Sequence, residues 1–399
     1  MLRFLTVRRL LPRTDLCRDR DDPAGQRVTT IELFFDLVFV FAVTQLSHSL
    51  LPEPTAAKAI HTLLLFGAIW WIWIDTSWVT NWLDPDRAPV RLMLLALMLG
   101  GLVLAASIPA AFGDRGLVFA ICYAVMQVGR SLFMLWALYG RSRTNFRNFL
   151  RITIWMTATA VLWIAGGLAE EEVRFTLWLL ALALDLASAW AGFWVPYLGR
   201  SMTADWDVDG GHLAERCGGF VLIALGESIT VTGATFFEAA WSSAVLGSFL
   251  AAFLGTAAMW WIYFDTGAER GSRHITAAAD PGRIARVLYT YVHAIIIAAV
   301  ILGAVGDDMT LAAATMPAGP VALLVLLGSP ILFLMGNVAF KQAISGRLPL
   351  SHLVGLALMI GVSLWSSGQS LLAVNLATSG VLIVVAIWES TSYRRPASR

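Results

Sequence analysis

An apolar stretch near the N-terminus, Val28–Leu51, is long enough to cross a lipid bilayer although it contains two acidic residues. A membrane-spanning helix needs about 20 consecutive, mostly apolar residues. Glu32 and Asp36 stand one helical turn apart in this stretch. An ionised carboxylate at membrane depth is costly unless a counter-charge or water meets it. We therefore expect other parts of the chain to supply partners for both carboxylates.

The composition is that of a polytopic membrane protein. Of the 399 residues, 58% are hydrophobic and only 14% are charged, whereas soluble domains carry about 25% charged residues. The net charge of +1 shows no excess of basic residues of the kind that binds a nucleic acid. The cysteines, Cys17, Cys122 and Cys217, lack the spacing of a metal or redox motif. We predict a lipid bilayer as the surroundings, with no nucleic-acid partner, no metal and no cofactor.

Apolar runs of spanning length recur along the chain and predict an all-α bundle of about twelve transmembrane helices. The runs cover residues 30–51, 58–78, 89–112, 116–139, 149–168, 175–197, 213–236, 242–264, 285–306, 319–341, 350–368 and 370–390. An even number of spans places both termini on one side. The basic residues in the loops and at the ends of the spans lie on that side, except Lys58, Arg115 and Arg174. The positive-inside rule then predicts that both termini are cytoplasmic.

The sequence also contains an internal repeat. Trp70–Thr76, WWIWIDT, matches Trp260–Thr266, WWIYFDT, at five of seven positions. Each copy closes the second span of a six-span half, so the halves would enter the membrane from the same side as parallel repeats. The predicted organisation is a cytoplasmic tail (1–27), a first six-helix repeat (28–198), a cytoplasmic linker (199–211), a second repeat (212–390) and a cytoplasmic C-terminal tail (391–399).

Polar residues inside the spans are the candidates for a transport path or proton relay. They are Glu32, Asp36, Thr44, Arg130, Asp185, Glu227 and His293. On a helical wheel, Glu32, Asp36 and Thr44 share one stripe of the first span. A polar stripe on a membrane helix faces water or a neighbouring helix rather than lipid. The stripe is equally compatible with a pore wall and with buried acids that only hold the bundle together.

Arg130 is the one basic residue deep inside a predicted span. It needs a carboxylate or water, and Asp36, Asp185 and Glu227 are the candidate partners. His293 lies deep in the ninth span, where its imidazole could relay protons if it is hydrated. Glu227 has no basic residue at its depth on its own helix, so a proton relay and a neutral structural role both stay open.

Two further groups have mainly structural interpretations. Asp75 and Asp265 lie at the cytoplasmic ends of the two repeat motifs. They are expected either to line a cytoplasmic vestibule or to hydrogen-bond the adjacent loop. Gly219, Gly226 and Gly233 recur every seven residues on one face of the seventh span. Small residues on one face predict close packing against a neighbouring helix.

Three functional classes follow from this pattern. The first is a transporter or channel for a small solute or cation, with proton coupling as one form. The second is a non-transporting scaffold or stress sensor whose polar residues are structural. An enzyme is the least favoured, because the loops are short and carry no P-loop, HExxH or Gly-x-Ser-x-Gly motif. The sequence leaves open whether copies of the chain form a homo-oligomer.

Two stretches resemble the signatures of the bacterial low-temperature requirement A family. They are Glu32–Leu46, ELFFDLVFVFAVTQL, and His212–Gly233, HLAERCGGFVLIALGESITVTG. The WW-x3-Asp-Thr element is similar to that family as well, and the resemblance covers residues 28 to 390. It implies a multi-pass protein of the bacterial inner membrane. It carries no catalytic residues over to this chain.

Overall fold

The computed structural model describes residues 16–19, 27–50, 55–202, 206, 208–265 and 281–393. Within these ranges the chain is helical and contains no β-strand. The elements are α1 (Thr30–Leu50), α2 (Ala56–Trp82), α3 (Ala88–Ser107), the 3-10 helix η4 (Ile108–Ala110), α4 (Gly116–Leu138), α5 (Arg143–Leu168), α6 (Glu171–Trp190), α7 (Gly210–Glu238), α8 (Ser243–Phe264), α10 (Pro281–Ala285), the π-helix η6 (Arg286–Val292), α11 (His293–Ala312), α12 (Pro320–Ser345), α13 (Leu350–Trp365) and α14 (Leu371–Tyr393).

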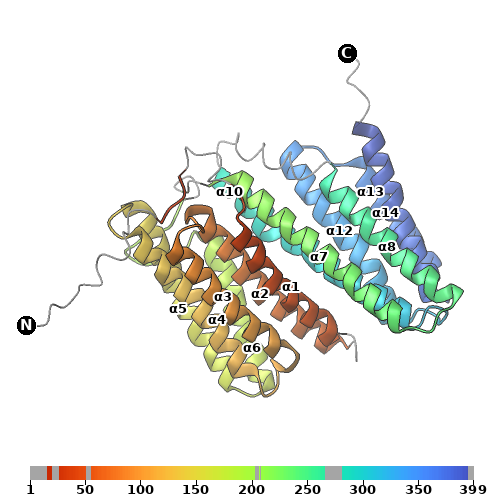
Figure 1. The fold of residues 1–399 in the computed structure, drawn as a ribbon, viewed down its shortest axis with the longest axis horizontal. Coiled ribbons are helices and arrows are strands. Elements are labelled where there is room, and N and C mark those ends of the chain that lie inside the picture. The colour runs from red at the N-terminus through yellow and green to blue at the C-terminus, as the bar shows by residue number, and fades with distance from the viewer. Residues whose placement is uncertain are drawn as a thin grey trace, which may run out of the picture. The chain divides into compact units, whose positions relative to one another are not determined.

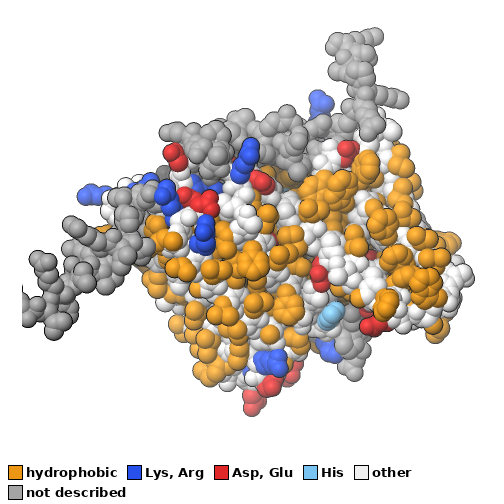
Figure 2. All heavy atoms as spheres, viewed as in Figure 1, with side chains coloured by type: hydrophobic (Ala, Val, Ile, Leu, Met, Phe, Trp, Pro, Cys, Tyr) orange, Lys and Arg blue, Asp and Glu red, His pale blue; other side chains and the backbone are white. Residues whose placement is uncertain are grey.

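The predicted polytopic helical fold is confirmed. Eleven helices in the described ranges are long and apolar enough to cross a membrane, and α13 is a shorter apolar helix of 16 residues. Many of their large hydrophobic side chains are exposed, such as Leu99 at 66% and Val125 at 64%. Figure 2 shows hydrophobic side chains covering much of the visible face. Such a surface is stable only against lipid, so the protein is embedded in a bilayer.

The predicted end of the sixth span is wrong. The apolar run predicts a helix to residue 197, but α6 ends at Trp190. The next residues include Gly192 and Phe193 with φ of 63° and 50°. Left-handed residues of this kind terminate a helix whatever the hydropathy of the residues that follow. Trp194 and the other apolar residues that follow α6 therefore belong to a connecting turn.

The chain forms two compact units. Unit 1 comprises Met1–Phe39 and Trp71–His212, and unit 2 comprises Val40–Trp70 and Leu213–Arg399. Within each unit the helices run side by side as a bundle (Figure 1). The division runs through α1 and α2, so the units do not coincide with the predicted six-helix repeats. The predicted repeat concerns the symmetry between two halves of the chain, whereas the two units are defined by contacts. The repeat therefore stays a prediction.

Unit 1 has an aromatic core between α4, α5 and α6. Tyr123 and Trp163 have ring centroids 4.3 Å apart, and Trp163 and Trp178 have centroids 5.5 Å apart. Phe119 packs against both tryptophans. The helices approach closely here because the last turn of α5 contains Gly166 and Gly167. A Cβ on Gly167 would lie 2.8 Å from the Cβ of Ala120 on α4.

Replacing Gly167 by alanine is expected to destabilise the protein by about 1–3 kcal/mol, because an overpacked contact forces neighbouring atoms to move. The matched control is Gly129→Ala on α4, where an added Cβ meets no described atom within 4 Å. Alanine there is expected to be neutral or slightly stabilising, since it is a better helix former than glycine. Thermal unfolding in detergent measures both variants. Equal effects of the two substitutions would contradict the close approach of α4 and α5.

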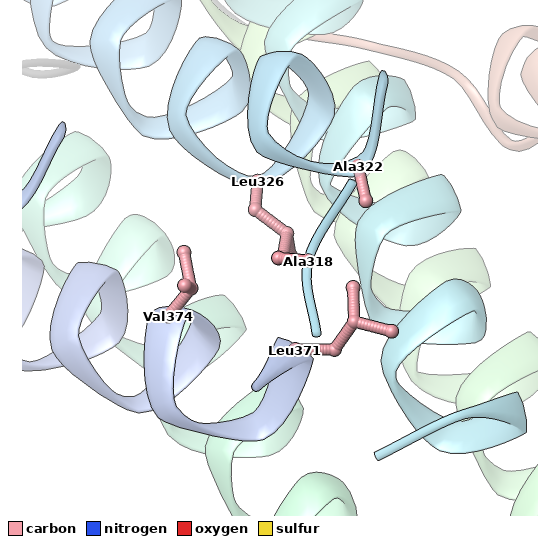
Figure 3. Close-up of a cluster of buried hydrophobic side chains, with 5 residues drawn as sticks. All are labelled: Ala318, Ala322, Leu326, Leu371 and Val374. Atoms are coloured by element: carbon pink, nitrogen blue, oxygen red, sulfur yellow. The ribbon is translucent and has the colours of Figure 1, made fainter. Parts of the chain in front are cut away.

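One end of unit 2 is closed by backbone pairing between two connections. The N–H of Ala318 donates to the carbonyl of Gln369 over 2.8 Å, and the N–H of Leu371 donates to Met316 over 3.0 Å. A cluster of buried apolar side chains lies beneath this pairing. It consists of Ala318, Ala322, Leu326, Leu371 and Val374, and Figure 3 shows these side chains grouped where α12 and α14 begin.

Candidate functional site

Glu32 is fully buried in unit 1 and contacts two basic side chains. Its Oε2 lies 2.8 Å from Nη2 of Arg18, and its Oε1 lies 2.8 Å from Nε2 of His212. The N–H and the hydroxyl of Thr29 also donate to Oε2, each over 2.9 Å. The expectation that Glu32 requires a counter-charge is confirmed. No sequence pattern indicated that the N-terminal segment would supply Arg18.

The position of His212 is fixed by the start of α7. Asp209 accepts a bond from the N–H of His212 over 3.0 Å, which caps the helix. The side-chain amide of Asn81 donates to the carbonyl of Asp209 and accepts from the N–H of Asp209. The amide nitrogen of Asn81 also lies 3.2 Å from Nδ1 of His212. If that amide donates to Nδ1, the ring proton is on Nε2 and points at Glu32, and we assign this tautomer. The cluster thus joins the N-terminal segment to α1, α2 and the first turn of α7 within unit 1.

Asp36 lies one turn further along α1 and is also fully buried. The indole Nε1 of Trp73 donates to its Oδ1 over 2.7 Å. Trp73 belongs to the Trp70–Thr76 repeat motif on α2. One tryptophan of that motif therefore binds an interior acid of unit 1.

Arg130 pairs with Asp75. Its Nη2 lies 3.2 Å from Oδ2 of Asp75, and its Nη1 donates to the hydroxyl of Thr76 and the carbonyl of Ile72. Gln127 accepts a short bond from Arg130 and donates to Asp75 over 3.3 Å. The predicted pairing of Arg130 with Asp36, Asp185 or Glu227 is wrong. The sequence misplaced Asp75 because α2 continues to Trp82, two turns beyond it.

Asp185 is buried in α6 and receives bonds from two neutral aromatic donors. Tyr123 donates to Oδ2 over 2.8 Å, and Trp163 donates to the same oxygen over 3.3 Å. The other oxygen, Oδ1, is buried and accepts no hydrogen bond of ordinary geometry from any described residue. Gln127 lies 3.4 Å from the Tyr123 hydroxyl. A chain of polar side chains therefore runs through unit 1 from Asp185 to the Arg130 pair.

Glu227 and Thr44 meet within unit 2. The hydroxyl of Thr44 lies 2.6 Å from Oε1 of Glu227 and 3.0 Å from the carbonyl of Val40. Both side chains are partly buried. These two residues, predicted from spans that lie far apart in the sequence, therefore share one site. Thr44 is the one hydrogen-bond partner that Glu227 has among the described residues.

His293 is fully buried in unit 2 at the point where η6 passes into α11. Its Nδ1 lies 2.8 Å from the carbonyl of Leu288, so the ring proton is assigned to Nδ1. Nε2 then accepts from the hydroxyl of Tyr263 over 2.8 Å. Its neighbours are the rings of Tyr263, Tyr289 and Phe340. The surroundings favour a structural role, and the predicted relay stays a prediction.

The remaining predicted residues lie at less distinctive positions. Asp265 is exposed at the end of α8 and accepts from Ser390 over 2.7 Å. Gly219 is partly buried. A Cβ on Gly226 or Gly233 would meet no described atom within 4 Å. The described contacts show no close helix approach at these two glycines, and the vestibule and packing roles stay predictions.

Two interior sites of unit 2 were missed. Lys341 on α12 binds Glu389 on α14 and lies 3.4 Å from Nε2 of His352. Lys341 is the last residue of the predicted tenth span and was not among the interior candidates. Asp307 on α11 accepts from the amide of Asn375 over 3.1 Å. It fell just beyond the predicted end of the ninth span, whereas α11 continues to Ala312.

Six of the interior carboxylates fall into two groups. Those paired with basic side chains are Glu32, Asp75 and Glu389. Those whose described partners are all neutral are Asp185, Glu227 and Asp307. In the part of the chain that the structure describes, no group of three or more His, Cys, Asp or Glu is placed to hold a metal ion.

Comparison with known proteins agrees with the resemblance noted from the sequence. Residues 27–387 match the family described as Bacterial low temperature requirement A protein (LtrA). The chain is similar to the uncharacterized protein RA0937 of Rhizobium meliloti (strain 1021), with 41% identity over 358 residues that cover 90% of this chain and 88% of that protein. No solved structure matches the chain.

Proposed function

The chain belongs to the bacterial low temperature requirement A family of proteins, and we propose that it is a transporter or channel for a small solute or cation. Proton coupling is one form of this activity, and the proposal includes no enzymatic reaction. Its setting is the bacterial inner membrane, with both termini in the cytoplasm. This orientation is supported by the distribution of basic residues along the sequence.

The observation that carries the proposal is the placing of Asp185 and Glu227. Both lie inside helices of spanning length, and their described partners, Tyr123, Trp163 and Thr44, are neutral. A carboxylate in a low-dielectric interior is balanced either by a fixed base or by a cation or proton that it binds. With neutral partners only, these two acids are suited to taking up and releasing a positive charge. Ion-paired acids such as Glu32 are not.

A parallel repeat is part of the proposal. Arg130 on α4 donates to the carbonyl of Ile72, and Lys341 on α12 donates to the carbonyl of Ile262 over 3.2 Å. Ile72 and Ile262 occupy the same position in the two repeat motifs. In each unit, a buried basic side chain thus binds the carbonyl at the same position of the motif. This match supports a repeat in which α2 and α8 are equivalent helices. Transport folds commonly use such repeats to form two alternating states.

The test is cation and proton flux into liposomes that contain the purified protein. We expect Asp185→Asn and Glu227→Gln each to reduce flux at least tenfold, because the amide cannot exchange a proton or balance a cation. Glu172→Gln is the matched control, because Glu172 is an exposed acid in the first turn of α6 and its loss should leave flux unchanged.

The competing function is a scaffold or stress sensor, which the three ion-paired acids favour. In that case the wild-type protein shows no flux under any applied gradient, and Asp185→Asn changes only thermal stability in detergent. Flux that is unaffected by both substitutions would also overturn the proposed role of these acids.

A further inference from the structure

A small cavity lined by both polar and apolar residues lies inside unit 2. It is lined by α7, α8, α11, α12 and α14, and it offers about 40 Å³ of space to the centres of water molecules. A single water needs about 10–15 Å³ by this measure. The cavity is therefore large enough for a small ion with one or two waters and too small for an organic solute.

The described wall of this cavity carries one acidic side chain and no basic one. Asp307 lines it, is 9% exposed, and accepts from Asn375 through Oδ1 alone. The lining contains no Lys, Arg or His among the described residues. No base on the described walls balances this carboxylate, so Asp307 holds either a proton or, in its ionised form, a cation inside the cavity.

Hydroxyl oxygens surround the same space. Ser228 on α7 and Thr256 on α8 are 4% and 7% exposed and line the cavity. Neither hydroxyl makes a hydrogen bond with another described residue. Ser329 donates to the carbonyl of Ala299 and Thr378 donates to the carbonyl of Asn375, so the lone pairs of both oxygens stay available to a ligand.

A glycine and a proline in the helices around the cavity leave oxygen atoms at its wall. A Cβ on Gly303 would lie 2.9 Å from Oγ of Ser329, so only glycine leaves room for that hydroxyl. Pro330 lies inside α12 and lacks an N–H. The carbonyl of Leu326, one turn earlier, therefore loses its usual helical donor, and both residues line the cavity. Leu326 also belongs to the apolar cluster beneath the closed end of unit 2 (Figure 3).

We propose that this cavity binds a small monovalent cation, with Na⁺ as the best-fitting probe, through the Asp307 carboxylate and the hydroxyls of Ser228 and Thr256. Oxygen ligands suit hard cations such as Na⁺, whereas Ca²⁺ and Mg²⁺ sites generally use more than one carboxylate or bound phosphate. The claim that this cation is also the transported ion rests on the proposed function. Binding itself can be measured without transport.

The experiment is thermal unfolding of the purified protein in detergent at constant ionic strength, with NaCl exchanged for choline chloride. Because a ligand of the folded state raises the melting temperature, we expect the wild-type value to rise with Na⁺ and not with choline, which is too large to enter. Asp307→Asn should weaken the apparent Na⁺ affinity at least tenfold. The control is Asp308→Asn, because Asp308 accepts from Thr235 and does not line the cavity.

Should Asp307→Asn fail to fold, Ser228→Ala combined with Thr256→Val removes two ligands at nearly constant volume and should weaken Na⁺ binding to a similar degree. An equal response of the wild type to Na⁺ and choline overturns the site, and so does a folded Asp307→Asn variant that keeps the wild-type Na⁺ response. Liposome flux without Na⁺ stabilisation would refute the site and keep the proposed function. Na⁺ stabilisation without flux would refute transport and keep the site.

Discussion

Replacing Glu32 by glutamine is expected to lower the free energy of unfolding by about 3–5 kcal/mol, as when one member of a buried ion pair is removed. Glu32 is fully buried and Arg18 is 7% exposed. Both oxygens of Glu32 accept from donors on Arg18, Thr29 and His212. A carboxamide presents one N–H₂ group to these donors and removes the negative charge that pairs with Arg18. Chemical unfolding in mixed detergent micelles, followed by tryptophan fluorescence, measures the loss.

Asp84→Asn is the control for this substitution. Asp84 pairs with Arg87 over 3.0 Å, but the two side chains are 25% and 44% exposed. Exposed ion pairs contribute less than about 1 kcal/mol. A double variant, Arg18→Gln with Glu32→Gln, removes both charges and should recover part of the loss. If Glu32→Gln destabilises no more than Asp84→Asn, the buried pair does not hold the N-terminal segment of unit 1 in place.

Replacing Arg130 by methionine is the second large effect, also about 3–5 kcal/mol. The Arg130 side chain is 2% exposed and binds Asp75, Gln127, Thr76 and the backbone of α2. Methionine fills a similar volume but leaves Asp75 without a base inside unit 1. The same unfolding measurement applies.

The control is Arg91→Met, because Arg91 is 49% exposed and pairs with Asp86, which is 72% exposed. Its loss should be within about 1 kcal/mol of zero. Adding Asp75→Asn to Arg130→Met removes the stranded charge and should restore part of the stability. A double variant that is less stable than Arg130→Met alone would show that Asp75 is stabilised by something other than Arg130.

The sequence predicted the helices well because hydropathy is the physical reason that they lie in a bilayer. Predicted and observed spans differ mainly at their ends, where hydropathy has little influence. The end of α6 is set by left-handed backbone at Gly192 and Phe193, and the start of α7 is set by the cap from Asp209. These are local backbone effects that an apolar run does not report.

The partners of the interior charges were harder to predict. The sequence indicated that Glu32 and Arg130 needed partners, but not which ones. Arg18 comes from a segment outside every predicted span, and Asp75 was placed too near a helix end. Pairing depends on the rotation and depth of each helix, and periodicity alone determines neither.

Asp307 and Lys341 were missed for a related reason. Each lies close to the end of an apolar run, and α11 and α12 both continue past that end. A hydropathy profile assigns such residues to loops. Hydropathy therefore does not report charged side chains near the ends of helices, although Lys341 pairs with Glu389 and Asp307 accepts from Asn375 inside unit 2.

The π-helix before α11 changes which face of the helix each residue of the segment 281–312 occupies. Seven residues, Arg286–Val292, follow an i to i+5 pattern, so this stretch holds more residues per turn than an α-helix. A wheel drawn through residues 281–312 with uniform spacing therefore assigns wrong faces on one side of the wide turn. Deleting one residue there would turn the preceding segment by about 100° relative to α11. Single-residue insertions and deletions at this point would thus act as a rotational adjustment of one helix against its neighbours in unit 2.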